Sequence, residues 1–338
     1  MKNKSNKIIY SIIILVIVVF ASVWYVIGRN QNNENDLNQE EPEQFNQEDI
    51  KDLQLEGAIY TAKTSQNETI IHKFNLDTSE EKVVFSDQKE KEKIKSLAGI
   101  INDKYILAQF MVTGQEFIGS LYKVSLDASA KKEEIAQDFA SSQPPKASPD
   151  GKKIAYTMFS NAEFDFGFKL IIANIDNTSM TEIDSDKSNI TIYSWDPNSK
   201  KICYKKGNDE DSTKLYYADV SSGKISNLAE IKGRVHDLFW GNEDLFVSSI
   251  QEKGKSLNQT ELFKFSLNNI KLDQITKNDK FESSVVVSPD LKGISYFSTT
   301  FEGEEKTAMK DGEIFISQIS GENVKKINDG NIVLGWMQ

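Results

Sequence analysis

Two histidines and one cysteine are the side chains of this sequence best suited to metal binding or nucleophilic chemistry. His72 and His236 are far apart in the chain, and neither has metal-ligand spacing around it. A zinc site would therefore need carboxylates in place of the usual nitrogen and sulfur ligands. Cys203 lies in the apolar run Ile202–Tyr204, so we expect a buried thiol, and a lone cysteine excludes an intrachain disulfide. We predict no metal and no cofactor.

Carboxylates give no catalytic pattern either. The acidic stretch Asn208–Asp211 lacks the alternating ligands and the glycine of a calcium loop, so we expect a solvated loop. The sequence has no Gly-x-Ser-x-Gly elbow, no phosphate loop and no dinucleotide fingerprint. A carboxylate pair for glycoside hydrolysis stays open, because 51 acidic residues offer many pairs. We predict that the chain is not an enzyme.

Aromatic residues form the most distinctive cluster. Four phenylalanines fall within Met158–Lys169: Phe159, Phe164, Phe166 and Phe168. With Phe117 and Phe301 they could form an apolar recognition surface for a protein partner. The alternation of Phe164, Phe166 and Phe168 is equally consistent with a strand that packs on a neighbouring sheet. Both interpretations remain open.

The elements that would carry these residues repeat along the chain. Apolar strands open at intervals of 45 to 52 residues, at Ile71, Leu121, Leu170, Leu215, Leu262 and Ile314. A turn motif recurs in step: Ser148-Pro149-Asp150-Gly151 precedes Ile154-Ala155-Tyr156, and Ser288-Pro289-Asp290 precedes Ile294-Ser295-Tyr296. Proline at the second position and glycine at the fourth suit a type I turn. Six copies of this length predict an all-β, six-bladed propeller of four-stranded blades.

Two details extend this prediction. The first copy lacks an innermost strand, and the last residues, Ile332–Met337, read as a strand. We expect this C-terminal strand to complete the first blade and close the ring. The connections between second and third strands are long, which marks one face as the candidate binding face.

The segment Ser148–Tyr156 resembles the repeat of TolB-like propellers, which also occurs in the propeller domains of prolyl-oligopeptidase-type peptidases. The resemblance covers about Leu53 to Gln338. It implies the fold and no particular activity, because the motif residues shape a turn. The chain departs from TolB in having an apolar N-terminal segment in place of a cleaved signal, and in lacking room for an N-terminal α/β domain.

The N-terminal region predicts a membrane anchor. Residues Ile8–Ile27 form an uncharged apolar run long enough to span a bilayer. Lys2, Lys4 and Lys7 precede it, so the positive-inside rule places residues 1–7 in the cytoplasm and the remainder outside the plasma membrane. A cleaved signal peptide is the alternative. Residues 28–52 are rich in Asn, Gln, Glu and Asp, which predicts a disordered acidic linker before a propeller at 53–338.

The net charge of −11 argues against a nucleic-acid partner, which needs a clustered basic surface. We therefore expect a membrane-anchored, extracytoplasmic propeller that acts as a non-catalytic protein-binding or scaffold module in the cell envelope. The alternative is a propeller that binds or cleaves polysaccharide with carboxylates and aromatic residues of its central channel.

Overall fold

A computed structural model describes residues 50, 52–65, 68–87, 92–112, 119–127, 129–139, 144–159, 168–184, 190–206, 211–251, 259–302, 308–309 and 311–338. The predicted anchor at Ile8–Ile27 lies outside these residues. Among the residues that are described, no helix is long and apolar enough to cross a membrane.

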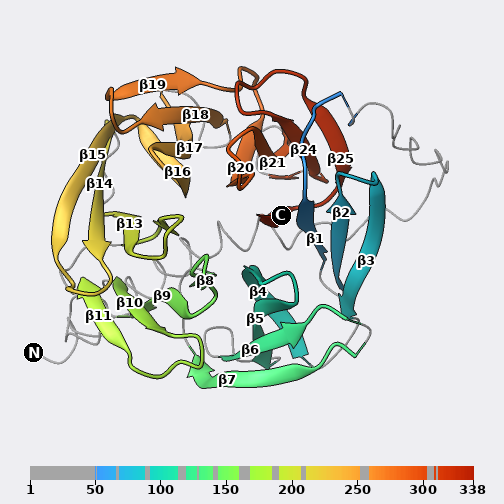
Figure 1. Ribbon diagram of the computed structural model, residues 1–338, viewed down its shortest axis with the longest axis vertical. Helices are drawn as coiled ribbons and strands as arrows, with labels where there is room; N and C mark the ends of the chain where they lie inside the picture. The colour runs from blue at the N-terminus through green and yellow to red at the C-terminus, as the bar shows by residue number, and fades with distance from the viewer. Residues whose placement is uncertain are drawn as a thin grey trace, which may run out of the picture.

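The predicted all-β, six-bladed propeller is confirmed. The described strands form six four-stranded antiparallel sheets, arranged as blades around a common axis with the C-terminal strand on the inner side (Figure 1). From the inside outward, blade 1 contains β26 (Ile332–Met337), β1 (Ala58–Thr64), β2 (Thr69–Asn75) and β3 (Glu80–Asp87). Blade 2 contains β4 (Glu92–Ile101), β5 (Tyr105–Val112), β6 (Gly119–Ser125) and β7 (Lys132–Phe139). Blade 3 contains β8 (Lys146–Ala147), β9 (Lys153–Phe159), β10 (Phe168–Asn174) and β11 (Thr181–Asp184).

The other three blades follow the same order. Blade 4 contains β12 (Tyr193–Trp195), β13 (Lys201–Lys205), β14 (Ser212–Asp219) and β15 (Ile225–Lys232). Blade 5 contains β16 (Arg234–Gly241), β17 (Asp244–Ile250), β18 (Glu261–Ser266) and β19 (Lys271–Gln274). Blade 6 contains β20 (Phe281–Val287), β21 (Gly293–Thr299), β24 (Glu313–Gln318) and β25 (Lys325–Asp329). Two short strands, β22 (Phe301–Glu302) and β23 (Ala308–Met309), pair with each other in the connection between β21 and β24.

Blade 1 combines the two ends of the described chain. Strand β26 pairs antiparallel with β1, and Trp336 lies opposite Ile59. The Trp336 indole N–H donates to the Glu56 carbonyl oxygen at 2.9 Å. Because β26 covers the inner edge of β1, that edge is not left unpaired.

The recurring turn motif combines a hydrogen bond from a serine hydroxyl with one residue in the left-handed backbone conformation. In blade 3 the Ser148 hydroxyl donates to Asp150 at 2.6 Å, and Gly151 has φ +68°. Blade 6 repeats the Ser288–Asp290 bond at 2.6 Å, but Leu291 takes the left-handed position with φ 60°. The side-chain bonds thus hold the turn even where glycine is absent.

The core lies between the blades. Every residue of β21 is buried, whereas β15 on the rim has a single buried residue, because inner strands are covered by neighbouring blades on both sides. Ile50 is buried against Leu53 and Trp336. The packed part of the chain therefore includes Ile50, which precedes the predicted domain start at Leu53.

Candidate functional site

The structure describes only part of the predicted aromatic surface. Phe117, Phe164 and Phe166 lie outside the described residues. Phe159 and Phe168 are paired backbone neighbours at the adjoining ends of β9 and β10, and the structure describes only their backbone. Phe301, in β22, is half-buried and packs edge-to-face on Phe281, with ring centroids 5.8 Å apart. The grouping of the six residues stays a prediction.

The two histidines lie in different blades and have different surroundings. The His72 Nδ1 atom lies 2.9 Å from Glu81, and this hydrogen bond is the main cause that lowers the pKa of Glu81. Burial, together with the charges of Arg234 and Lys205, lowers the pKa of His236 to about 4. His236 is therefore neutral at pH 7.

The remaining candidate residues give no cluster. Cys203 is fully buried, as expected, and burial raises the pKa of its thiol. Of the acidic stretch at 208–211, only Asp211 is described. Within the part of the chain that the structure describes, no group of three or more His, Cys, Asp and Glu side chains could hold a metal ion.

A pocket of about 250 Å³ lies where blade 5 meets blade 6. Residues of blade 6 form one wall of the pocket. In the strand register, Glu282 lies opposite Ser298 and Tyr296 lies opposite Phe315. These four side chains share one face, because residues two apart on a strand point to the same side. The Tyr296 and Phe315 rings stack with centroids 5.8 Å apart.

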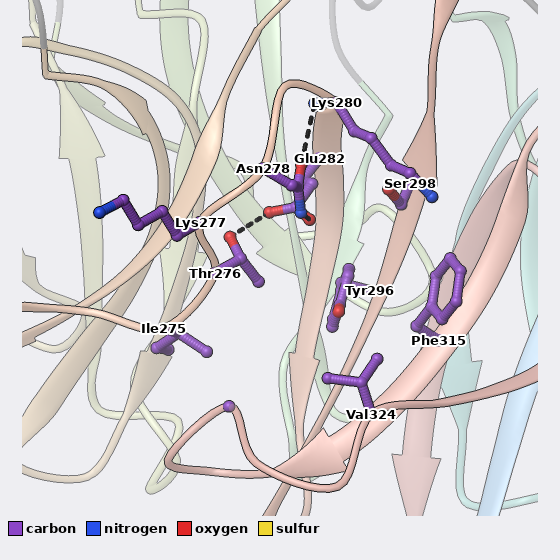
Figure 2. A pocket seen from close by; sticks show the side chains of 11 residues that line it. Ile275, Thr276, Lys277, Asn278, Lys280, Glu282, Tyr296, Ser298, Phe315 and Val324 are labelled. Atoms are coloured by element: carbon purple, nitrogen blue, oxygen red, sulfur yellow. Dashed lines mark hydrogen bonds between the residues drawn. The ribbon is translucent and has the colours of Figure 1, made fainter.

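The segment that leaves β19 forms the opposite wall. It brings Ile275, Thr276, Asn278 and Lys280 to the pocket (Figure 2). Ile275 and Val324 form an apolar end below the aromatic rings in Figure 2, and the polar side chains gather at the other end. A pocket with one apolar and one polar end can orient a small ligand.

The polar end contains a shared proton. The Thr276 hydroxyl contacts Glu282 and lies 3.0 Å from Glu261, and it accepts the Leu262 N–H at 2.8 Å. One hydroxyl has one proton to donate, so it can satisfy only one ionised carboxylate. The network is complete when Glu282 is protonated and donates to Thr276, which donates to Glu261.

The environment of Glu282 supports this assignment. Its side chain is fully buried, and burial raises the pKa of Glu282 to about 7, although the contacts of its carboxyl group with Thr276 and Asn278 act in the opposite direction. The nearby charge of Glu261 acts in the same direction as burial. A carboxyl with a pKa of about 7 is half protonated at pH 7, and its protonated form can donate as well as accept a hydrogen bond.

Sequence reasoning did not find this pocket. The only signal was the Ile-x-Tyr repeat, which places Tyr296 at the position of Tyr156 and Tyr204 in other blades. The remaining wall depends on how the segment after β19 lies against blade 6, and no local pattern encodes that contact.

Comparison with known proteins relates the chain to one curated sequence and to solved structures of the same fold. No family model matches the sequence. The chain is 23% identical over 223 residues to dipeptidyl-peptidase 5 from Porphyromonas endodontalis, covering 62% of this chain and 29% of that protein. The chain thus spans less than a third of the length of this curated relative.

Two solved structures share the architecture. A putative TolB from Agrobacterium tumefaciens matches with a TM-score of 0.58 and 18% identity, over 82% of this chain and 92% of that one. TolB from Acinetobacter baumannii matches with a TM-score of 0.61 and 16% identity, over 83% of this chain and 66% of that one. At these identities the likeness concerns the fold and carries no activity with it. The chain has the TolB-like six-bladed β-propeller fold.

Proposed function

We propose that this chain is a non-catalytic binding module of the cell envelope, which captures a protein partner through the long-loop end of its blades. The observation that carries the proposal is the Phe281–Phe301 pair. Phe301 lies in the connection after β21, which is predicted to belong to the binding face, and Phe281 is the first residue of β20 beside it. Half-buried aromatic side chains at a rigid edge are typical anchors of protein interfaces.

The proposal includes a membrane tether. The apolar run Ile8–Ile27 and the preceding Lys2, Lys4 and Lys7 support an uncleaved helix with a cytoplasmic N-terminus. The acidic linker then gives the propeller lateral freedom at the outer face of the plasma membrane. Carbonate washing of membranes tests the anchor, and protease added to intact cells tests the orientation. Release by carbonate, or protection from the protease, would contradict this part.

Chemical crosslinking in intact cells, followed by affinity capture of the full-length chain, tests partner binding. Phe301→Ser should abolish capture of the partner that the unchanged chain retains. Ile270→Ser is the matched control, because Ile270 is an exposed apolar residue on the β18–β19 turn, at the other end of its blade from the β17–β18 connection. The same captured proteins with Phe301→Ser and with the unchanged chain would overturn the proposed face.

A further inference from the structure

Three tyrosines occupy the same position in the second strands of blades 3, 4 and 6. The Tyr156 hydroxyl donates to Asn177 at 3.0 Å, and the Tyr204 hydroxyl donates to Asp184 at 2.8 Å. The third, Tyr296, is 3% exposed and lines the pocket between blades 5 and 6. Its hydroxyl makes no hydrogen bond within the described residues, so it differs from its two counterparts.

A second hydroxyl in the pocket is also unpartnered. Ser298 lies two residues after Tyr296 on the same face of β21 and is 2% exposed. Its Oγ atom is buried without a hydrogen-bond partner among the described residues. A buried polar group left unpaired costs about 1 to 3 kcal/mol. Each hydroxyl therefore retains hydrogen-bonding capacity at the wall of the pocket.

Lys280 brings a positive charge to the polar end of the pocket. The Lys280 ammonium lies 3.8 Å from Glu313, at the limit of an ion pair, whereas Lys326 lies 2.9 Å from the other oxygen of that carboxylate. Figure 2 shows the Lys280 side chain running toward Ser298 and Phe315, and its ammonium lies 5.2 Å from the Phe315 ring centroid. Lys326 also pairs with Asp329 at 2.9 Å, so its charge is shared between Asp329 and Glu313. Lys280 contacts Glu313 only at the limiting distance, and an anion in the pocket would compete with Glu313 for it.

The carboxyl group closest to the two hydroxyls does not oppose an anion. Glu282 lies opposite Ser298 in the sheet, and its proton completes the hydrogen bonds around Thr276. Below about pH 7 Glu282 is mostly protonated and adds little negative charge to the polar end. At the other end, Ile275 and the 44% exposed Val324 offer apolar surface.

We propose that this pocket binds a small monocarboxylate, with its carboxylate held by Lys280, Ser298 and Tyr296 and its short apolar body packed on Ile275 and Val324. The pocket volume of about 250 Å³ suits a molecule of phenylacetate size. A ligand this small binds with a Kd on the order of 1 to 10 mM. The polar end of the pocket adjoins the Phe281–Phe301 pair, because Phe281 pairs with Thr299 and Glu282 with Ser298 in the sheet. The proposal concerns a different ligand and does not depend on capture of a protein partner.

Ligand-observed NMR on the full-length chain in detergent tests the proposal, with phenylacetate as the probe. Saturable binding is expected, and the uncharged isostere phenylacetamide should bind at least about tenfold more weakly, because one charge-assisted contact is worth that much. Equal affinity for the two molecules, or no saturable binding of phenylacetate, would overturn the proposal.

Variants locate the site. Lys280→Gln should weaken phenylacetate binding about tenfold. Ser298→Ala should weaken it severalfold while raising the Tm, because it removes a buried hydroxyl that has no partner. Ser295→Ala is the control, since the Ser295 hydroxyl donates to the Phe315 carbonyl oxygen and its side chain lies on the other face of β21. Unchanged affinity in Lys280→Gln and Ser298→Ala would place the bound probe elsewhere and refute the assignment.

Discussion

The Tyr204 hydroxyl donates a hydrogen bond to the Asp184 carboxylate at 2.8 Å and thereby joins blade 4 to blade 3. Tyr204 is fully buried and Asp184 is 4% exposed, so water cannot easily replace either partner. Tyr204→Phe should lower the free energy of unfolding by about 1.5 to 3 kcal/mol, the range for a bond to a charged acceptor. Urea unfolding measures the change.

Tyr216→Phe is the matched control for this bond. Tyr216 stacks on Tyr204 with ring centroids 6.2 Å apart, but its hydroxyl makes no hydrogen bond within the described residues. The free energy of unfolding of the control should lie within about 0.5 kcal/mol of that of the unchanged chain. Equal losses in the two variants would show that the Asp184 bond contributes nothing to stability.

The β18–β19 turn contains a strained residue. Ile270 has φ 53° and is 79% exposed, although a β-branched side chain strongly disfavours the left-handed region. Ile270→Gly should relieve this strain and stabilise the fold by about 1 kcal/mol. Thermal unfolding would register the change as a higher Tm.

Ile225→Gly provides the comparison. Ile225 is also exposed, at 41%, but it begins strand β15 and does not have a positive φ. Glycine should therefore destabilise this position by about 0.5 to 1 kcal/mol. A lower Tm in both variants would mean that the backbone at Ile270 is not strained.

Two glycines with positive φ differ in the space around them. A Cβ atom on Gly233 would lie 2.3 Å from the Ile250 carbonyl oxygen, whereas one on Gly223 would meet nothing within 4 Å. Gly233→Ala should lower the free energy of unfolding by about 3 kcal/mol or more, because backbone strain adds to a clash with a strand. Gly223→Ala should cost about 1 kcal/mol from its φ of +68° alone. Similar urea midpoints for the two variants would contradict this order.

The fold could be predicted from the sequence because the strand spacing repeats six times and the turns of blades 3 and 6 are encoded locally. Ser148 and Asp150 act within four residues, so their pattern is visible locally. The site could not be predicted in the same way. Glu282 and Ser298 become neighbours through strand register, and Thr276 meets them through an inter-blade connection. The aromatic cluster could be predicted from the local spacing of its residues. The hydroxyls of Ser298 and Tyr296, which have no partner among the described residues, can be recognised only in the folded structure.

The shared proton at Glu282 makes stability depend on pH. Its pKa rises from the ordinary value of 4.5 to about 7 in the folded state, mainly through burial. Between these values the folded state binds more protons than the unfolded state, so the free energy of unfolding falls as pH rises through that window. The slope from this one group reaches at most about 1.4 kcal/mol per pH unit. Glu261, Lys280 and Tyr296 also face this carboxyl group, which is why the variant below changes Glu282 alone.

Glu282→Gln tests this dependence, because the amide keeps the shape of the side chain and cannot titrate. Urea unfolding from about pH 5 to pH 8 should show that the unchanged chain loses stability relative to the variant as pH rises, mostly below about pH 7. Glu322→Gln is the control, since Glu322 is an exposed carboxylate of the same blade, and its difference curve should be flat. A flat or rising curve for Glu282→Gln would show that Glu282 is already ionised in the folded protein. The polar end of the pocket would then carry a negative charge beside Ser298, and it would disfavour the carboxylate proposed for it.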